Sequence, residues 1–233
     1  MPLDRRSVSE STASRLSLYL RSLAVLEAEG VAHVSSQALA RRFDLNSSQI
    51  RKDLATFGEF GLRGVGYGVA ALRRHLVTIL GLDETRRVAI VGAGRLGMAL
   101  ADYPGFGSGG FAITAVFDDD PARISTRTRS GVVVTDVSHL PALVAELGIE
   151  IAVLAVPARA ASDAGRLCWE SGIQAILNFT AARLPAPPNV HVKNVDLRVR
   201  LETLSFYIGG AFPLPGKEEP WPRGRSRSLH RRT

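Results

Sequence analysis

A glycine-rich segment followed at a distance by an acid is the part of this sequence whose residue types and spacing best fit a binding chemistry. Gly92, Gly94 and Gly97 form a G-x-G-x-x-G pattern between an apolar run that ends at Val91 and a run compatible with a helix. Gly92 permits a tight turn, Gly94 lets a pyrophosphate approach the backbone, and Gly97 lets the helix pack closely. The free N–H groups at the start of that helix favour an anion. We therefore expect a dinucleotide to bind at Gly92, Ala93, Gly94, Arg95, Leu96 and Gly97.

The acid is Asp118, which ends the next apolar run and lies 21 residues after Gly97. A carboxylate that hydrogen-bonds the ribose 2′-hydroxyl belongs at about this position. Its negative charge would repel a 2′-phosphate, so the spacing favours NAD(H) over NADP(H). The alternative is an α/β turn that has lost its ligand.

A second group of side chains has the chemistry to contact nucleic acid. We expect two short helices around the turn 44–46: residues 37–43, capped by Ser35 or Ser36, and a second helix to Phe57 that starts from a capping box of Asn46 and Gln49. Two short helices joined by a tight turn describe a helix-turn-helix. Arginine reads guanine and glutamine reads adenine in the major groove. The DNA-facing candidates on this helix are Ser48, Gln49, Arg51 and Lys52.

A glycine-rich stretch, 58–68, follows this helix and predicts a hairpin. Arg63 and Tyr67 would lie on it as a wing that touches phosphate or the minor groove. The alternative for the basic pair Arg51 and Lys52 is a solvated helix face without a partner.

The charge distribution agrees with a polyanion partner for the N-terminal part. The chain of 233 residues carries a formal net charge of +7; residues 1–80 contribute +4, residues 81–210 contribute −1 and residues 211–233 contribute +4. No apolar run approaches the ~20 residues of a membrane helix, so we expect no membrane partner. The start of the chain is polar and does not resemble a secretory signal. The single cysteine, Cys168, fits a reducing cytoplasm.

The remaining elements must position these candidate sites. We expect helices at 14–29 and 70–80, a domain boundary near 81–86, and then strands that alternate with helices. The strands are expected at 88–91, 111–117, 131–134, 151–156, 174–178 and 190–194, with helices at 140–147 and 160–171. This alternation predicts an open, doubly wound parallel sheet, whose ligand lies across the carboxyl ends of the strands. At that edge, Val156, Pro157, Asn178 and Phe179 would meet the nicotinamide half.

The sequence offers no catalytic equipment beside the nucleotide pattern. The five histidines fall on no motif, and neither metal-ligand spacing nor a nucleophile elbow is present. Cys168 stands in an apolar helical run beside Trp169, which favours a buried thiol over a nucleophile. A nicotinamide domain without such groups indicates sensing rather than an enzyme.

The last predicted helix, 197–208, carries an apolar stripe. Such a stripe after a completed sheet either packs on its own domain or docks onto a second subunit. Residues 211–233 are expected to form a basic disordered tail. The stripe consists of Leu197, Leu201, Leu204 and Ile208.

Taken together, the chain resembles the Rex family of bacterial redox-sensing transcriptional repressors over about residues 14–210. The Arg-Lys-Asp-Leu string at 51–54, Arg-Gly-Val-Gly-Tyr at 63–67 and Asp-Tyr-Pro-Gly-Phe at 102–106 carry the resemblance more specifically than the glycine loop does. Further matches are 14–16 with 19–21, Ile-Leu-Asn-Phe at 176–179 and Asn-Val-Asp at 194–196. The tail after residue 211 departs from the family pattern.

The resemblance implies a homodimer with a winged helix-turn-helix domain (1–83), a Rossmann NAD(H)-binding domain (84–194) and a C-terminal dimerisation helix swapped between subunits (195–210). It implies that the dimer binds operator DNA when NADH is scarce and releases it when NADH binds, with NAD⁺ competing. It also implies that Arg21 and Asp196 form an inter-subunit switch pair, and that Tyr103 competes for Asp196 in the NADH state.

Three other interpretations remain open at this point. The first is an NAD-dependent oxidoreductase with an accessory N-terminal domain, which requires a general base that the sequence does not offer. The second is a DNA-binding protein whose Rossmann domain serves only dimerisation. The third is a CoA-binding domain of similar topology, which Asp118 disfavours.

Overall fold

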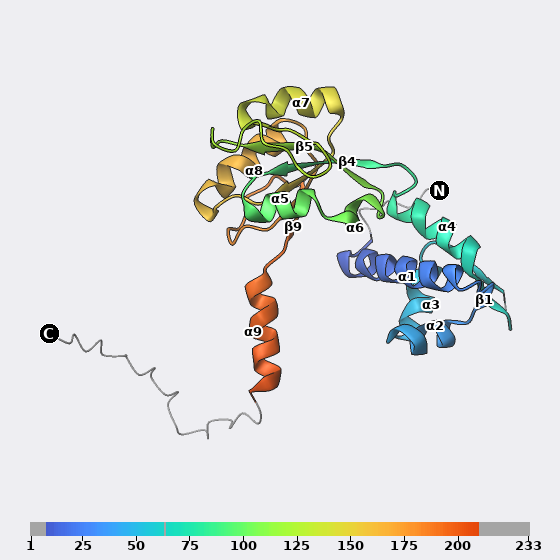
Figure 1. Cartoon of the computed structure of the whole chain (residues 1–233). Coiled ribbons are helices and arrows are strands. Elements are labelled where there is room, and N and C mark those ends of the chain that lie inside the picture. Colours follow the sequence, from blue (N-terminus) through green and yellow to red (C-terminus); the bar gives the residue numbers. More distant parts are fainter. Residues whose placement is uncertain (1–7, 63, 210–233) are drawn as a thin grey trace, which may run out of the picture. The chain divides into compact units, whose positions relative to one another are not determined.

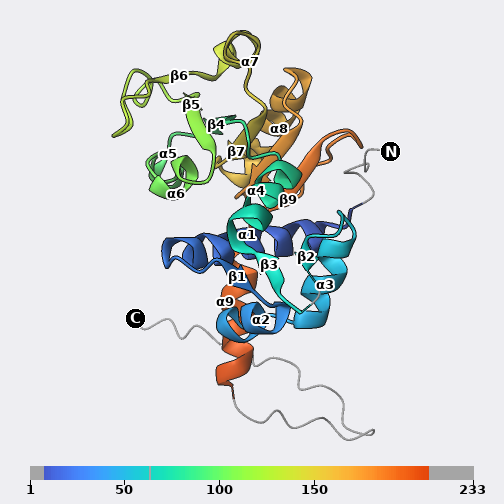
Figure 2. The same ribbon diagram turned by 90° about the vertical axis from the view of Figure 1, so that its right-hand side faces the viewer.

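The computed structural model describes residues 8–62 and 64–209, and the chain divides into two compact units, Met1–Asn194 and Val195–Thr233. The first elements build a winged helix-turn-helix (Figures 1 and 2). In chain order these are α1 (Glu10–Ala28), β1 (His33–Val34), α2 (Ser36–Phe43), α3 (Ser47–Ala55), β2 (Gly61–Leu62), β3 (Gly66–Gly68) and α4 (Val69–Leu80).

One apolar core holds the helices of this part together. Leu16 and Leu23 of α1, Ile50 and Leu54 of α3 and Leu76 of α4 are each at most 2% exposed and belong to one cluster. Burial of side chains of this size stabilises the fold by about 1.5–3 kcal/mol each. The orientation of α3 therefore depends on the face it buries against α1 and α4.

Local signals in the sequence set the ends of the two short helices. The Ser35 hydroxyl accepts from the N–H of Ala38 (3.0 Å) and starts α2, and the Asn46 side chain accepts from the N–H of Gln49 (3.0 Å) and starts α3. Asp44 has a φ of 52° and ends α2 in the left-handed region. The two helices are thus joined by the tight turn that the sequence predicts.

The small sheet has the order β1-β3-β2, and both pairings are antiparallel. The hairpin of β2 and β3 is the predicted wing. Its partner β1, only two residues long, has no counterpart in the expectations from sequence.

The second part is a six-stranded parallel sheet in the order β6-β5-β4-β7-β8-β9. In chain order the strands take the positions 3-2-1-4-5-6, which is the doubly wound dinucleotide-binding order. The elements are β4 (Arg86–Val91), α5 (Arg95–Ala101), α6 (Pro104–Gly107), β5 (Phe111–Asp118), β6 (Val134–Asp136), a 3-10 turn (Val137–His139), α7 (Leu140–Leu147), β7 (Ile151–Leu154), a 3-10 turn (Ala158–Ala160), α8 (Ala161–Glu170), β8 (Ala175–Asn178) and β9 (His191–Asn194).

The strands alternate their side chains between two cores, as a sheet covered on both faces requires. Val88 and Ile90 of β4 belong to the cluster that contains Ala101 of α5. Ala89 and Val91 of the same strand belong to the cluster formed with α7 and α8. Figure 1 shows α5 and α7 on opposite sides of the sheet.

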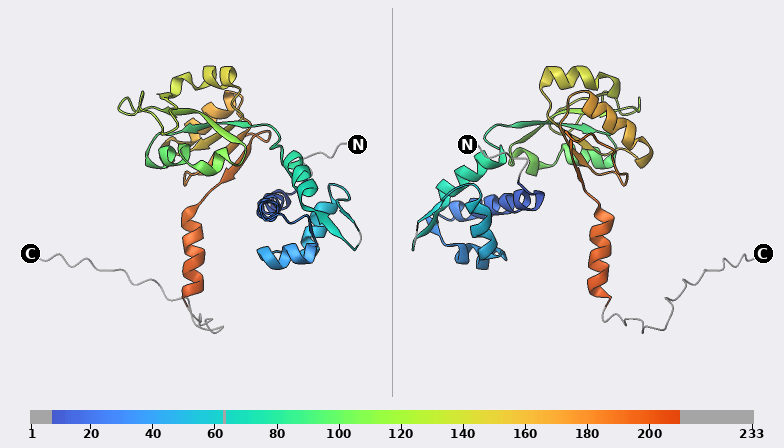
Figure 3. Two further views of the ribbon diagram at one scale, coloured as in Figure 1. Left: turned by 45° about the vertical axis from the view of Figure 1, so that its right-hand side comes forward. Right: turned by 180° about the vertical axis from the view of Figure 1, so that it is seen from behind.

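Helix α9 (Leu197–Ile208) has the bounds that the sequence predicts and is seen as one continuous helix in Figure 3. Its predicted stripe is exposed by 59–85% along its length. Val199, Phe206 and Tyr207 are exposed as well, so the apolar surface is wider than a single stripe. Among the residues given above, no helix is both long and apolar enough to cross a bilayer.

The predicted winged helix-turn-helix and the predicted doubly wound parallel sheet are confirmed, and the exchange of α9 between subunits stays a prediction. Several predicted element bounds are wrong. Helix α1 begins at Glu10, four residues before the expected start, because Ser9 accepts from the N–H of Thr12 and caps it. Strand β6 begins at Val134, because the preceding residue Val133 forms an isolated bridge with Arg127 instead. The domain limits at 83, 194 and 210 stay predictions, and the basic tail lies outside the described residues.

Candidate functional site

The glycine loop has the geometry that the sequence predicts. Gly92 has a φ of 102°, and a Cβ atom there would lie 2.7 Å from the carbonyl oxygen of Ala155, so no other residue fits without a shift of the backbone. A Cβ at Gly97 would overlap the carbonyl of Gly92. At Gly94, by contrast, the nearest atom beyond the neighbouring residues is 4.0 Å away, on Arg123. The loop is therefore closed on the protein side at Gly92 and Gly97 and open at Gly94, where a phosphate would approach.

Asp118 holds this loop in place. Its carboxylate is 4% exposed and accepts from the N–H of Ala93 (2.5 Å) and from the N–H of Asp120 (2.9 Å). Burial raises the pKa of Asp118, but the two N–H groups and the guanidinium of Arg123 outweigh burial and hold this pKa below its ordinary value. The carboxylate is thus ionised at neutral pH and fastens the end of β5 to the loop after β4.

Arg123 is a residue of this site that the sequence reasoning missed. Its Nη1 atom lies 3.2 Å and 3.4 Å from the two carboxylate oxygens of Asp118, and its Nε lies 3.4 Å from Asp120. A carboxylate offers about four acceptor positions, and the two N–H groups and Nη1 of Arg123 already make four contacts with its oxygens. Asp118 can therefore accept from ribose hydroxyls only if the side chain of Arg123 moves away or shares the carboxylate oxygens with them.

The residues predicted at the carboxyl edge of the sheet do come together there, but they differ in how far they are buried. Val156 and Phe179 are half-buried and Pro157 is exposed. Asn178 is fully buried; its amide donates to the carbonyl of Ala182 and to the side chain of Asn194, both at 2.8 Å. Its carbonyl oxygen accepts from the N–H (3.0 Å) and the hydroxyl (2.7 Å) of Thr180. The side chain of Asn178 therefore shapes this edge through contacts within the protein.

Residues 102–103 join α5 to α6. Tyr103 is 56% exposed, and its ring packs edge-on against Phe106 with centroids 5.2 Å apart. A Cβ at Gly105 would collide with the Tyr103 ring, so the absence of a side chain there lets the ring lie against the backbone. Of the other two residues of the implied switch, Arg21 is exposed on α1, and exposed Asp196 accepts from the N–H groups of Arg198 (2.9 Å) and Val199 (3.2 Å) as the cap of α9.

The outer face of α3 presents exposed Ser48, Arg51 and Lys52. Arg51 donates to the hydroxyl of Ser36 at the start of α2 (2.9 Å) and to the hydroxyl of Ser48 (3.1 Å). These contacts hold the guanidinium near the start of both helices. The half-buried ring of Tyr67, on β3, and Arg51 line one hollow between α3 and the wing. Arg63 lies outside the described residues.

Gln49 departs from its expected place in the capping box. The side chain of Asn46 forms its half of the box, but the amide of Gln49 donates to Asp53 over 2.7 Å. A hydrogen bond to an ionised carboxylate is stronger than one between two neutral groups. The side chain of Gln49 therefore turns along the helix to Asp53 rather than back to the backbone N–H of Asn46, as a capping box would require.

The remaining reactive groups are inert in this fold. Burial raises the pKa of the Cys168 thiol to about 12, so the thiolate that reacts with oxidants is scarce at neutral pH. In the part of the chain that the structure describes, no three histidine, cysteine or acidic side chains gather as metal ligands would.

Comparison with known proteins agrees with both halves of this arrangement. Residues 7–55 match the model of a family described as the N-terminus of a putative DNA-binding protein, and residues 83–182 match the model of a CoA-binding domain. The first match covers α1 to α3, and the second covers β4 to β8.

Full-length relatives extend the likeness. The chain is 44% identical over 202 residues to the redox-sensing transcriptional repressor Rex of Desulfitobacterium hafniense, covering 87% of this chain and 96% of that one. It is 47% identical over 201 residues to the protein of the same name from Syntrophomonas wolfei, covering 86% and 95%.

Solved structures of RSP are similar over the same span. RSP in complex with β-NAD⁺ and operator DNA matches with a TM-score of 0.83 at 37% identity, over 87% of this chain and 93% of that one. RSP in complex with β-NADH matches with a TM-score of 0.78 at 35% identity, over 87% and 95%.

Proposed function

This chain belongs to the Rex family of redox-sensing transcriptional repressors, and from that premise we propose how its residues divide the work. The protein is an NADH-sensing repressor: it binds operator DNA when NADH is low and leaves the DNA when NADH binds. The observation that carries this conclusion is the match to RSP over 87% of the chain, in structures described with β-NAD⁺ and operator DNA and with β-NADH.

The nucleotide site is assigned to the glycine loop and the carboxyl edge of the sheet. The pyrophosphate would approach the open backbone at Gly94, and Asp118 would hold the loop and face the adenosine ribose beside Arg123. The nicotinamide would lie toward the edge after β7 and β8. The proposed contacts are Gly92, Ala93, Gly94, Arg95, Leu96, Gly97, Asp118, Val156, Pro157, Asn178, Phe179 and Tyr103.

A difference in hydration supports a preference for NADH. NAD⁺ carries a cationic nicotinamide ring, and moving a cation from water into an apolar surrounding is costly. The rings of Tyr103 and Phe106 pack edge to face and Tyr103 is exposed, and we propose that this pair offers apolar surface to the nicotinamide. The uncharged dihydronicotinamide ring of NADH loses less hydration free energy on entry, so a rise in NADH displaces NAD⁺ and shifts the protein toward the NADH-bound arrangement.

The DNA site is assigned to the outer face of α3 and to the wing. Arg51 and Lys52 are the charged contacts, with Ser48 beside them and Tyr67 on the wing. Gln49 and Arg63 complete the residues proposed from sequence, and Arg63 lies outside the described residues. A recognition helix that enters the major groove with its first turns presents these positions to the bases.

The switch requires a second copy of the chain. We assign dimerisation to the exposed apolar surface of α9, exchanged between subunits, and the inter-subunit contact to Arg21 and Asp196, with Tyr103 as competitor. Two recognition helices related by two-fold symmetry fit two half-sites in one arrangement of the dimer only. A ligand that prefers the other arrangement thereby releases the DNA.

The protein is a regulator rather than a metabolic enzyme, and we further propose that it does not turn NADH over. A dehydrogenase needs a general base poised at the nicotinamide, and the residues placed at this edge offer amide, aromatic and aliphatic groups. As a repressor it acts where the chromosome lies, which in the bacteria of the relatives is the cytoplasm.

The direct test is a titration of purified protein on an operator, a pseudo-palindrome with half-sites spaced by helical turns. NADH, NAD⁺ and CoA are added separately at fixed salt, because phosphate contacts make affinity depend steeply on ionic strength. Release by NADH and not by NAD⁺ is the expected result. Binding that ignores every nucleotide would reduce the Rossmann domain to a dimerisation platform, release by CoA alone would reassign the ligand, and turnover of NADH would restore the enzyme interpretation.

A further inference from the structure

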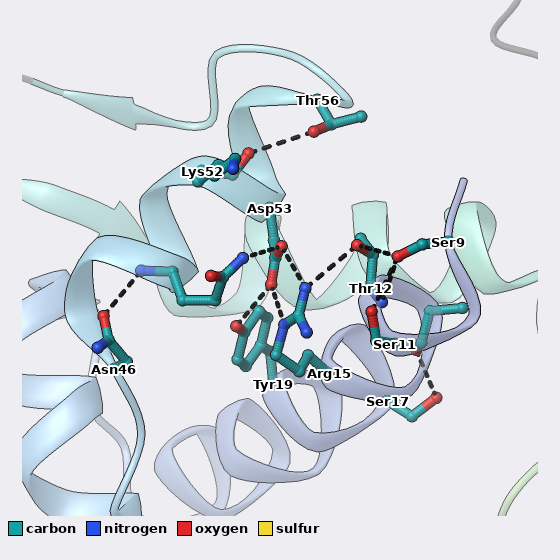
Figure 4. A network of polar contacts seen from close by, with 12 residues as sticks. Ser9, Ser11, Thr12, Arg15, Ser17, Tyr19, Asn46, Lys52, Asp53 and Thr56 are labelled. Carbon is teal, nitrogen blue, oxygen red and sulfur yellow. Dashed lines mark hydrogen bonds and ion pairs between the residues drawn. The ribbon is translucent and has the colours of Figure 1, made fainter. Parts of the chain in front are cut away.

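A buried carboxylate ties the recognition helix α3 to α1. Asp53 is 3% exposed and lies between the two helices (Figure 4). It accepts from Nε and Nη2 of Arg15 (2.6 and 2.8 Å), from the hydroxyl of Tyr19 (2.9 Å) and from the amide of Gln49 (2.7 Å). Arg15 and Tyr19 are one turn apart on α1, so this helix holds Asp53 at two points.

The chemistry of the cluster fixes the direction of each group. Burial raises the pKa of Asp53, but the hydrogen bonds from Arg15, Gln49 and Tyr19 outweigh burial and hold it below its ordinary value. The ionised carboxylate only accepts hydrogen bonds, so the group of Gln49 that faces it must be the NH₂. Arg15 is fixed at its other side by Thr12, whose hydroxyl accepts from Nη2 over 3.1 Å.

The cluster also decides what the start of α3 can present to a ligand. Gln49 occupies the third position of the helix, between exposed Ser48 and buried Ile50. Bidentate reading of adenine needs both the oxygen and the NH₂ of a glutamine free to turn toward one base edge. With its NH₂ held by Asp53, the side chain lies along the helix toward α1, and the outer face is left to Ser48, Arg51 and Lys52.

We infer that Arg15 and Asp53 are positioning residues for operator recognition: their bidentate pair sets the orientation of α3 on α1, and Gln49 belongs to this cross-link instead of reading a base. The inference rests on the proposed DNA binding. It assigns functional roles to Arg15 and Asp53 and changes the role predicted for Gln49.

The competing explanation is that the pair serves stability alone. Removal of one partner of a buried ion pair leaves an uncompensated charge and destabilises strongly, whereas replacement of both partners by apolar side chains of similar volume is often neutral or stabilising. Replacement of both Arg15 and Asp53 therefore removes the uncompensated charge that would destabilise the fold, but it does not restore the hydrogen bonds that orient α3 on α1.

The experiment compares the full-length wild type, Arg15→Met, Asp53→Leu and the double variant. Each is measured for its melting temperature, its NADH affinity, and its affinities for operator and for random DNA at one salt concentration. We expect the double variant to melt near the wild type and to bind NADH normally. Its ratio of operator to random-DNA affinity falls by about tenfold or more, the scale of one mismatched base pair. A double variant with the wild-type ratio overturns the inference.

Milder variants keep the test decisive if the double variant does not fold. Arg15→Lys keeps the charge but loses the planar fork that binds a carboxylate in bidentate fashion, and we expect it to lower the ratio as well. The matched control is Glu27→Gln, which breaks the Glu27–Arg73 pair (3.1 Å) between α1 and α4 and should leave the ratio unchanged. An unchanged ratio in Arg15→Lys contradicts the inference.

Gln49 is tested on a panel of operators with single base substitutions. If Gln49 only positions α3, Gln49→Ala lowers affinity by a similar factor on every operator. A loss confined to operators that keep one particular base would show that Gln49 reads that base and would overturn its assignment. Failure of the wild type to bind any operator would instead reject the proposed function, so the two failures are distinguishable.

Discussion

Arg123 covers the carboxylate of Asp118, with Nη1 3.2 Å from Oδ2, beside the position that we propose for the adenosine ribose. Asp118 alone argues for exclusion of a 2′-phosphate, whereas an arginine near this position accommodates one. In this pair, Asp118 therefore favours NAD(H), whereas Arg123 favours NADP(H).

We expect Arg123→Ala to sharpen the preference for NADH over NADPH. The variant removes the cation that offsets Asp118, so the ratio of the NADPH to the NADH dissociation constant should rise by about threefold, the scale of an exposed ion pair. Titration calorimetry at fixed salt measures both constants. Arg129→Ala, which removes an exposed arginine 4.0 Å from Asp102, is the control. A ratio that stays constant or falls speaks against this role for Arg123.

We expect Arg51→Ala to separate the two binding activities. Loss of a contact to DNA should weaken operator binding by about tenfold or more and, if the contact is to phosphate, reduce the salt slope of binding by about one. NADH affinity should not change. Arg166→Ala on α8 removes another exposed arginine as a control for net charge. Retained operator affinity in Arg51→Ala would reject its place in the DNA site.

Asp196 tests the coupling between the sites. Asp196→Ala should weaken the effect of NADH on DNA binding more than it weakens either binding alone, because the charge expected to pair with Arg21 is gone. The carboxylate also caps α9, and loss of a cap costs about 1 kcal/mol. Asp196→Asn keeps a capping oxygen and removes only the charge, so it should lose coupling with α9 intact. Operator release by NADH equal to that of the wild type in both variants would sink the assignment.

Leu204→Asp should dissociate the dimer that we propose α9 to hold together. Leu204 is 61% exposed at the centre of the α9 stripe, and a buried leucine of this kind contributes about 1.5–3 kcal/mol. We expect the dissociation constant of the dimer to rise at least about tenfold, as measured by light scattering over a dilution series. The control is Glu202→Gln, which changes the charge by one unit on the opposite side of the helix. Dimers of Leu204→Asp as stable as those of the wild type would place the interface elsewhere.

Acid should unfold the wild type partly through Asp53. Its pKa is lower in the folded chain than the value of about 3.9 in the unfolded chain, so the unfolded state binds more protons in the interval between them. Stability from Asp53 is therefore complete above pH ~4 and is lost as the pH falls through the folded pKa. Asp53→Asn should lie well below the wild type in melting temperature at pH 7 and approach it at pH 3. Asp163→Asn, at an exposed carboxylate, should show no such convergence, and a constant difference for Asp53→Asn contradicts the mechanism.

Features with local causes could be predicted from the sequence. The glycine loop, the turn between α2 and α3 and the limits of α9 follow from residues close together in the chain, such as the cap of Asn46 on the N–H of Gln49. The parallel, doubly wound class of the large sheet followed from the alternation of apolar runs with helices, whereas its strand order came only from the structure. In each of these cases, the residues that indicate the feature lie within or next to the element that they predict.

Features that depend on distant partners could not be predicted. Arg15 and Asp53 are 38 residues apart in the chain, and their pairing appears only when α1 packs on α3. The same carboxylate draws Gln49 away from the expected capping box. Strand β1 is two residues long, too short for an alternating pattern, and exists because β3 offers it an edge. The sequence around Arg123 indicates only a surface arginine. The turn after β5 places its side chain over Asp118.

The burial of Cys168 bears on how long a redox signal lasts. A thiol with a pKa near 12 inside the core is a poor target for peroxide, and the chain has no second cysteine with which to form an intramolecular disulfide. A sensor built this way keeps no covalent record of past oxidation and needs no reductase to reset it. Its memory is as short as the residence time of the bound nucleotide, so gene expression can follow the NADH pool downward as readily as upward.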